Sequence, residues 1–276
     1  FPYKVILLDE ASMVNSVTFA QIISKISDDT IFIIVGDDGQ LPAIGAGNIL
    51  ADSIKYELAP ICKLTKIYRQ NENQAIAVIA NDIRKGELPN YKEEYEDFKF
   101  VDVSIGNYYS MKNSLSQNEF SDMRGENSEY ILNNILNIAS NYIQNYYDFI
   151  KEKNIGKALT LFQVITPMKG GVLGVENLNI ELQRLFNHTK NKSLKIKEIE
   201  YKLTDKVIHI KNENMKAQTM SMYKSNSTEF MERRVYNGQL GLVIKLDFDE
   251  KKCVVLYPND DMVVFYDFDN IHHLLN

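Results

Sequence analysis

The sequence predicts an α/β protein that ends in a small antiparallel β-barrel, and three observations predict it. A short apolar run at residues 5–8 ends in acidic residues, a helical stripe follows, and a second apolar run occupies residues 31–35. Continuous apolar runs are typical of parallel strands covered on both faces, so these segments predict a strand, a crossover helix and a parallel strand. After about Tyr201, short β-rich runs alternate with turn residues, which favours a barrel.

Composition and charge narrow the class of protein. The 276 residues leave room for two ordinary domains, and the 37 acidic and 31 basic side chains give a formal charge of −6. This charge excludes a histone-like protein that binds DNA through bulk charge. Residues 1–150 carry 12 basic and 21 acidic side chains, whereas residues 151–276 carry 19 and 16. A contact with nucleic acid is therefore expected in the second half.

Cysteine content and hydropathy indicate the cellular setting. The two cysteines, Cys62 and Cys253, form no CxxC pair, which excludes a disulfide scaffold or a structural zinc cage and favours a reducing, cytoplasmic location. The longest apolar runs are far shorter than the roughly 20 residues that cross a bilayer, so neither a membrane span nor a signal peptide is predicted. Because the sequence begins at Phe1 inside an apolar strand, we expect a fragment whose natural front is missing.

The elements of the first half follow from periodicity. Phe19 and the three isoleucines that follow it up to Ile26 form one apolar helical stripe, with Asn15 or Ser16 as the N-cap. The second apolar run ends in the sequence GDDG at residues 36–39. Ligands of open α/β sheets bind at the carboxyl ends of the strands, so the acidic residues after both runs are candidate site residues. A further apolar stripe at residues 76–83 predicts a helix that Gly86 ends.

The second half is predicted to change from helices to strands. Residues 106–128 are rich in Ser and Asn and are expected to form a mobile loop, residues 132–146 a long amphipathic helix, and residues 161–165 a buried strand. The predicted barrel strands cover residues 207–210, 240–246, 253–257 and 262–266, with residues 215–228 as a polar excursion from one hairpin. Asn237 and Gly238 indicate a type I′ hairpin turn.

The acidic pair Asp9 and Glu10 has the chemistry that phosphoryl transfer from ATP requires. One carboxylate can hold Mg²⁺ through its water shell, and its neighbour can orient and deprotonate the attacking water. An isolated acidic pair after a strand also serves as a cap or a solvated turn. Gln40 adds an amide that can hydrogen-bond a γ-phosphate, and Arg69 can stabilise the charge that develops during transfer or can simply pair with a surface carboxylate.

A cation followed by flexible backbone marks a second candidate site. Lys169 precedes two glycines, which let the backbone approach phosphates closely. The same residues also suit an ordinary strand-to-helix turn.

Six sequence segments, in order, resemble RecD-type superfamily-one DNA helicases. DEASM at residues 9–13, GDDGQLPAIGAGNIL at 36–50 and IYRQ at 67–70 resemble the Walker B, third and fourth helicase motifs of that family. QVITPMKGGVLGVENLNIELQ at 163–183 resembles its segment that contacts single-stranded DNA. DKVIHIKN at 205–212 and VYNGQLGLV at 235–243 resemble its inserted SH3-like barrel. Thr204 and Gln239 depart from the family pattern, which usually has a glycine and an acidic residue at these positions.

The resemblance implies partial RecA-like motor domains and a role for each matching residue. Residues 1–66 would be the C-terminal part of the first motor domain, residues 67–200 the N-terminal part of the second, and residues 201–276 the SH3-like barrel. Asp9 would hold the magnesium, Glu10 would activate water, and Gln40 and Arg69 would contact the γ-phosphate of ATP. The remaining residues that the resemblance implies are Gly36 and Asp37 for the nucleotide, and Pro167, Met168, Lys169, Asn179 and Asn237 for DNA.

The implied parent is an ATP-dependent helicase that moves 5′ to 3′ on single-stranded DNA in recombination and repair, similar to exodeoxyribonuclease V alpha subunits. Its partners would be single-stranded DNA and RecB- and RecC-like subunits. No GxxxxGK[ST] phosphate cradle and no HKSQG-like motif occur in the sequence, so we expect an internal fragment with weak or no nucleotide binding and no ATPase activity of its own.

Two other functions remain open at this stage. Asp9, Glu10, Asp37 and Asp38 could serve a two-metal nuclease, which requires carboxylates that converge on metals about 3.5–4 Å apart. The barrel and the basic segment that leads into it could instead form a binding module for DNA or a protein partner, without enzymatic activity.

Overall fold

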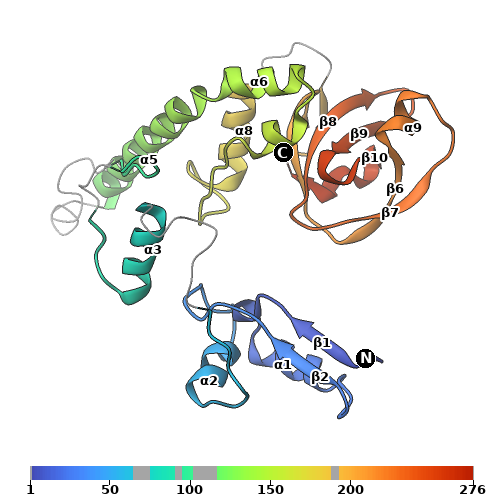
Figure 1. Cartoon of the computed structure of the whole chain (residues 1–276). Helices are drawn as coiled ribbons and strands as arrows, with labels where there is room; N and C mark the ends of the chain where they lie inside the picture. The colour runs from blue at the N-terminus through green and yellow to red at the C-terminus, as the bar shows by residue number, and fades with distance from the viewer. Residues whose placement is uncertain (1, 65–74, 91–94, 102–116, 188–192, 276) are drawn as a thin grey trace. The chain divides into compact units, whose positions relative to one another are not determined.

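The computed structural model describes residues 2–64, 75–90, 95–101, 117–187 and 193–275 (Figure 1). The chain divides into two compact units, Phe1–Val101 and Asp102–Asn276. The predicted domain boundary after residue 66 lies outside the described residues, and the one after residue 200 falls within a short strand of the second unit. The three-part division therefore stays a prediction.

The first unit contains the predicted strand, helix and parallel strand. Strands β1 (Val5–Leu8) and β2 (Ile31–Ile34) pair in parallel from Val5 opposite Ile31 to Leu8 opposite Ile34. Helix α1 (Ser16–Ile23) connects them after the 3-10 turn η1 (Ala11–Met13). Asn15 caps α1, because its Oδ1 accepts a hydrogen bond of 2.9 Å from the backbone N–H of Thr18. This order confirms the predicted crossover.

The expectation that these strands are covered on both faces is wrong for the described residues. Exposure alternates along each strand, and Val5, Leu7 and Ile31 are more than half exposed. The ring of Phe32, on the other face of the sheet, lies 6.1 Å from that of Phe19 in α1. Helix packing therefore covers one face of this two-stranded sheet.

Two further helices lie in the described part of the first unit. Helix α2 (Ile49–Lys55) begins at Asn48, whose side chain accepts a hydrogen bond from the backbone of Ala51. Helix α3 (Ala75–Lys85) buries Ala75, Ala77 and Ile79. Gly86 has a φ of 77° directly after α3, so the predicted glycine stop is confirmed.

The helices of the second unit correct two predictions. Those described before the barrel are α5 (Gln117–Ser140), α6 (Ile143–Lys151), α7 (Ile155–Thr160) and α8 (Val175–Phe186). Residues 117–128, predicted as part of a mobile loop, are helical, because extending an existing helix costs far less than nucleating one; residues 106–116 lie outside the described residues. The helix predicted over residues 132–146 is broken at Asn141 and Tyr142, whose N–H groups bond to carbonyls three residues back, in 3-10 fashion.

The strand predicted at residues 161–165 is also wrong. These residues belong to no strand of the described sheets, and Ile165 is 89% exposed. An apolar run becomes a strand only where a neighbour supplies hydrogen bonds, and no described strand of this unit lies alongside this one. Residues 162–166 are called the linking segment below.

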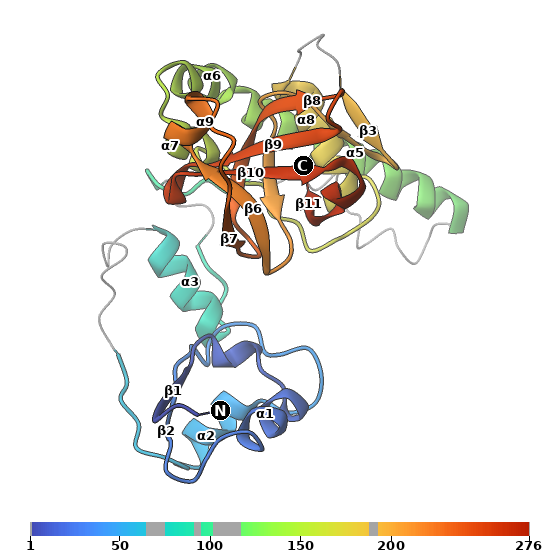
Figure 2. The same ribbon diagram turned by 90° about the vertical axis from the view of Figure 1, so that its right-hand side faces the viewer.

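The barrel predicted from the short β-rich runs is confirmed. A curled antiparallel sheet has the order β11-β5-β8-β9-β10-β6-β7 (Figures 1 and 2). Its strands are β5 (Lys206–His209), β6 (Glu213–Thr219), β7 (Met231–Val235), β8 (Leu240–Asp247), β9 (Lys252–Tyr257), β10 (Met262–Asp267) and β11 (Leu274–Leu275). A separate hairpin of β3 (Leu194–Ile196) and β4 (Ile199–Tyr201) precedes them. The predicted polar excursion is instead the strand β6, helix α9 (Met220–Lys224) and the residues that lead to β7.

The turn at Asn237 and Gly238 differs from the prediction. Gly238 has a φ of 88°, but Asn237 does not have a positive φ, and Gln239 N–H donates to the carbonyl of Tyr236. This geometry is of the type II kind, which requires positive φ only at its third residue. The strands β7 and β8 on either side are not neighbours in the sheet, so the turn does not close a hairpin.

The barrel core is largely apolar and contains a buried chain of polar side chains. Val207, Val243 and Val264 are fully buried in it. The hydroxyl groups of Tyr257 and Tyr266 lie 2.7 Å apart, and that of Tyr266 lies 3.1 Å from Nδ1 of the fully buried His209. Burial lowers the pKa of His209, which favours its neutral form.

No helix among the described residues combines the length and the apolar character that crossing a bilayer requires.

Candidate functional site

The carboxyl ends of β1 and β2 bring two motif turns together. Beyond the strands, Val35 N–H donates to the carbonyl of Leu8 at 2.8 Å, and Ala11 N–H donates to that of Val35 at 3.0 Å. Gly36 makes this approach possible, since a Cβ there would lie 3.1 Å from the backbone nitrogen of Ala11. The turns that carry Asp9 and Gly36 therefore share one edge of the sheet, where ligands of α/β sheets bind.

The acidic pair is open to solvent at this edge. Asp9 and Glu10 are both exposed, and Asp9 Oδ1 accepts a hydrogen bond of 2.9 Å from the backbone N–H of Glu10. Glu10 has a φ of 51°, a left-handed conformation that is uncommon for residues other than glycine. Oxygen ligands on an exposed carboxylate suit Mg²⁺, which keeps several of its own waters, so Asp9 fits a magnesium ligand.

The turn after β2 is shaped by the side chain of Asp37. Its Oδ1 accepts a hydrogen bond from the backbone N–H of Gly39 at 3.0 Å, and its carbonyl accepts one from that of Gln40 at 3.2 Å. The exposed Gln40 therefore lies at the end of a closed turn that starts at the sheet edge.

An arginine from α3 binds both aspartates of this turn. Arg84 Nη1 lies 3.1 Å from Asp37 Oδ1, and its Nη2 lies 2.7 Å from Asp38 Oδ1. The guanidinium group packs over Gly39, where a Cβ would lie 2.6 Å from Cζ of Arg84. Arg69, the arginine that the sequence assigns to the γ-phosphate, lies outside the described residues.

This pairing favours a nucleotide site over a two-metal nuclease at the same edge. Asp37 and Asp38 both interact with Arg84, whereas a nuclease needs their carboxylates to converge on metal ions with Asp9 and Glu10. In the part of the chain that the structure describes, no group of three or more His, Cys, Asp or Glu side chains has metal-binding geometry.

The second candidate site is the loop of residues 166–174, called the DNA loop below after the contact that the sequence resemblance implies. It folds back on α8, because Val175 N–H donates to the carbonyl of Met168 at 3.0 Å and Glu176 N–H to that of Lys169 at 3.2 Å. The hydroxyl of Thr166 donates to the carbonyl of Leu173 at 2.7 Å and closes the loop. Pro167, Met168 and Lys169 are exposed at its outer side.

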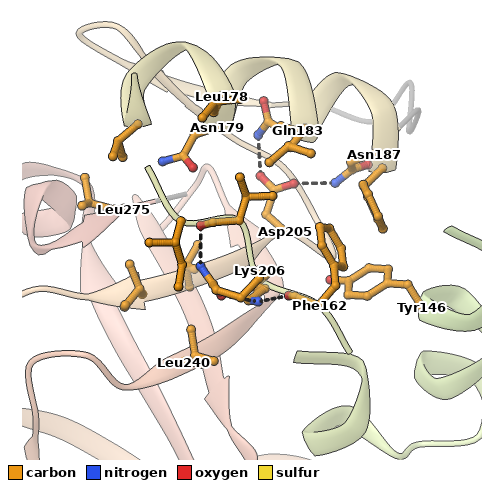
Figure 3. A pocket seen from close by; sticks show the side chains of 18 of the residues that line it. Tyr146, Phe162, Leu178, Asn179, Gln183, Asn187, Asp205, Lys206, Leu240 and Leu275 are labelled. Atoms are coloured by element: carbon orange, nitrogen blue, oxygen red, sulfur yellow. Dashed lines mark hydrogen bonds between the residues drawn. The ribbon is translucent and has the colours of Figure 1, made fainter. Parts of the chain in front are cut away.

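The two weaker DNA candidates lie on other elements. Asn179 is in α8 and lines a cavity of about 410 Å³ between α8, the linking segment and the start of β5 (Figure 3). Asn237 is in the turn after β7, where its N–H donates to Oδ1 of Asn212 at 2.8 Å. The structure thus groups Pro167, Met168 and Lys169 in one loop but does not place Asn237 on it.

Three residues with many contacts at these sites were not predicted. Arg84 contacts residues 46 and 47 positions earlier in the chain, and Lys206 contacts residues 43 and 44 positions earlier. Asp205 is buried, with side-chain partners in α8. The DKV motif marks Asp205 and Lys206 in the sequence, but nothing local to Arg84 indicates its partners.

Two family models each match a part of this chain. Residues 2–104 match the family model of an AAA domain, and residues 178–257 match that of the SH3 domain of ATP-dependent RecD-like DNA helicases. These two matches, with the RecD relatives described next, support a RecD-type superfamily-one helicase. The partial motor fold and the SH3-like barrel predicted from the sequence agree with both matches.

Individual relatives of this RecD-type chain are longer proteins. The ATP-dependent RecD2 DNA helicase of Deinococcus radiodurans is 25% identical over 246 residues, which cover 89% of this chain and 26% of the relative. The RecBCD enzyme subunit RecD of Buchnera aphidicola subsp. Acyrthosiphon pisum is 26% identical over 211 residues, which cover 65% of this chain and 33% of that subunit. The chain therefore spans about a quarter to a third of the length of these curated relatives.

Among solved structures, a Pif1 helicase from Bacteroides in complex with ADP-AlF3 and ssDNA aligns with 96% of this chain and 53% of its own. The TM-score is 0.35 and the sequence identity is 14%.

Proposed function

We propose that this chain provides part of the ATP site and part of the DNA track of an ATP-dependent helicase that moves 5′ to 3′ along single-stranded DNA. The observation that carries the proposal is the shared sheet edge, where the turns of Asp9 and Gly36 meet within the segment that matches the AAA family. An exposed cationic loop in the second unit of the same chain supplies a surface for DNA.

The residues at the sheet edge take distinct roles in this proposal. Asp9 holds Mg²⁺ through water, and the magnesium ion would neutralise charge on the phosphates of ATP. Glu10, adjacent and equally exposed, orients the attacking water and accepts its proton. Gln40 senses the γ-phosphate from the end of its turn, with Gly36 and Asp37 beside the nucleotide. Arg69 stabilises the charge that develops on the transferred phosphoryl group.

The DNA loop takes the role of a phosphate-backbone contact. Lys169 provides the positive charge, and the exposed Pro167 and Met168 lie beside it. Asn179 and Asn237 are proposed as additional DNA contacts. The salt dependence of such binding measures how many phosphates the protein contacts, because each contact releases condensed counterions.

The chain by itself is proposed not to hydrolyse ATP, because none of its 276 residues forms a GxxxxGK[ST] cradle for the β- and γ-phosphates. We place the complete helicase in recombination and repair in the cytoplasm, either alone or with RecB- and RecC-like subunits. The second possibility is supported by the relative from Buchnera aphidicola, which is a RecBCD enzyme subunit.

Fluorescence anisotropy with a labelled oligo-dT strand tests the DNA role of the purified chain. We expect binding that weakens as salt increases, and weaker binding in the variant Lys169→Met. Lys245→Met is the matched control, because Lys245 lies in β8 of the same unit and pairs with Asp247. Absence of binding by the unmodified chain at low salt would refute the DNA role.

The ATP role is tested in a longer polypeptide that joins this chain to a segment with a Walker A lysine. DNA-stimulated ATP hydrolysis is expected there, with loss in the variant Glu10→Gln. If DNA binding is present but hydrolysis is absent, the chain acts as a binding module only. Hydrolysis that is unchanged by Glu10→Gln would refute the catalytic role of Glu10.

A further inference from the structure

The DNA loop is attached to the barrel on both sides by two adjacent residues. It lies between the linking segment and α8, and neither of these neighbours is a strand of the barrel sheet. Asp205 and Lys206, where β5 begins, contact one neighbour each, as Figure 3 shows. These two side chains therefore help to set the position of the loop relative to the barrel, together with the apolar contacts of Phe186 and β8.

Lys206 binds the linking segment. Its Nζ donates to the carbonyl of Phe162 at 3.1 Å and to Oε1 of Gln163 at 2.9 Å, and it lies 5.9 Å from the centre of the Phe162 ring. Among the described residues, Lys206 makes the hydrogen bonds between this segment and the barrel, because no strand pairs with the segment. The rest of the interface is the largely apolar lining of the cavity of about 410 Å³.

Asp205 binds α8. Its Oδ2 accepts a hydrogen bond of 2.6 Å from Nε2 of Gln183, and its Oδ1 accepts one of 2.6 Å from Nδ2 of Asn187. Oδ2 also accepts a hydrogen bond of 2.6 Å from the backbone N–H of Lys202. Asp205 is 3% exposed, so this carboxylate is held by several donors away from water.

Lys206 is in a different environment from that of a lysine that contacts DNA. It is partly buried, and burial lowers its pKa. Its ammonium group already donates to two protein oxygens, whereas Lys169 is exposed at the outer side of the loop. The two lysines should therefore affect DNA binding in different ways.

We propose that Asp205 and Lys206 are positioning residues that hold the DNA loop in a fixed place on the SH3-like barrel. This inference rests on the proposed function of the loop and adds the means by which the barrel controls it. Neither residue contacts DNA itself in this arrangement.

The salt dependence of single-stranded DNA binding provides the decisive test. Lys206→Met should weaken the binding of an oligo-dT strand about three- to tenfold, within the range reported for residues that act through a contact network. The slope of log K against log salt should stay unchanged, because no phosphate contact is lost. Lys169→Met should reduce that slope by about 0.7, the value for one phosphate contact on a single strand.

Two variants serve as controls: one keeps the positive charge at residue 206, and the other removes a lysine elsewhere in the barrel. Lys206→Arg should retain most of the affinity, because a guanidinium group can donate to the same two oxygens. Lys245→Met removes a lysine from the same barrel away from the loop and should bind as the unmodified chain does. The proposal is overturned if Lys206→Met binds normally, or if its salt slope decreases as that of Lys169→Met does.

Hydrogen exchange separates this inference from the proposed function. Lys206→Met should accelerate amide exchange in residues 163–176 while exchange in β8, β9 and β10 stays slow. Failure of the unmodified chain to bind DNA would refute the DNA role, and faster exchange in the variant would still support the positioning role. Unchanged exchange in residues 163–176 would overturn the inference whether or not DNA binds.

Discussion

Replacing Gly36 by alanine should separate the two turns that form the nucleotide edge. A Cβ at this position would lie 2.7 Å from Cδ2 of Leu50, 3.1 Å from the backbone nitrogen of Ala11 and 3.3 Å from that of Ser12. Leu50 is 6% exposed and has little space to move. The two nitrogens belong to the backbone turn after β1, which is held by the hydrogen bond from Ala11 N–H to the carbonyl of Val35. Overpacking of this kind typically costs about 1–3 kcal/mol.

Gly39 offers a matched control three residues further along the same turn. The three heavy atoms nearest to a Cβ there all belong to the flexible side chain of Arg84, which is 45% exposed and can shift at the expense of its partly exposed ion pairs with Asp37 and Asp38. We therefore expect Gly39→Ala to cost well under 1 kcal/mol, close to the value for surface substitutions of about 0.5 kcal/mol.

Hydrogen exchange by mass spectrometry measures the free energy of opening for β1 and β2 in each variant. Gly36→Ala should reduce it by about 1–3 kcal/mol, and Gly39→Ala should leave it nearly unchanged. Equal costs for the two variants, or no cost for Gly36→Ala, would refute the view that close approach of backbone requires glycine at residue 36.

Three further predictions concern charge and thiol chemistry. Arg84→Ala should lower the free energy of unfolding of the first unit by about 1 kcal/mol or less, because the ion pairs with Asp37 and Asp38 are partly exposed. Urea unfolding followed by circular dichroism measures this free energy, and a larger decrease would contradict the prediction. The pKa of His209 is lowered in the fold, so the unfolded chain binds a proton at this histidine first as pH falls. The free energy of unfolding should therefore be constant above about pH 6.5 and should decrease below it by up to about 1.4 kcal/mol per pH unit. His209→Gln should show a shallower decrease. Burial raises the pKa of Cys253 to about 12, so a thiol reagent at pH 8 should modify the exposed Cys62 rapidly and Cys253 only on unfolding, and equal rates would contradict the burial.

The sequence is informative where a pattern has a local physical cause. The apolar run, the helical stripe and the second run fix the order of β1, α1 and β2, because each element is recognised by its own period. The turn residues after Tyr201 likewise mark most barrel strands. Prediction fails at residues 161–165, where an apolar run has no described strand beside it, because the sequence of a strand does not contain its partner.

The sequence by itself determined the family motifs, the acidic pair Asp9 and Glu10 at the end of a strand, and the cation at Lys169 before two glycines. Only the tertiary structure decided that Arg84 occupies both aspartates after β2 and that Lys206 holds the linking segment. These contacts join residues more than forty positions apart. Side-chain spacing along the chain encodes local periodicity, whereas partners at such separation are set by how the elements pack.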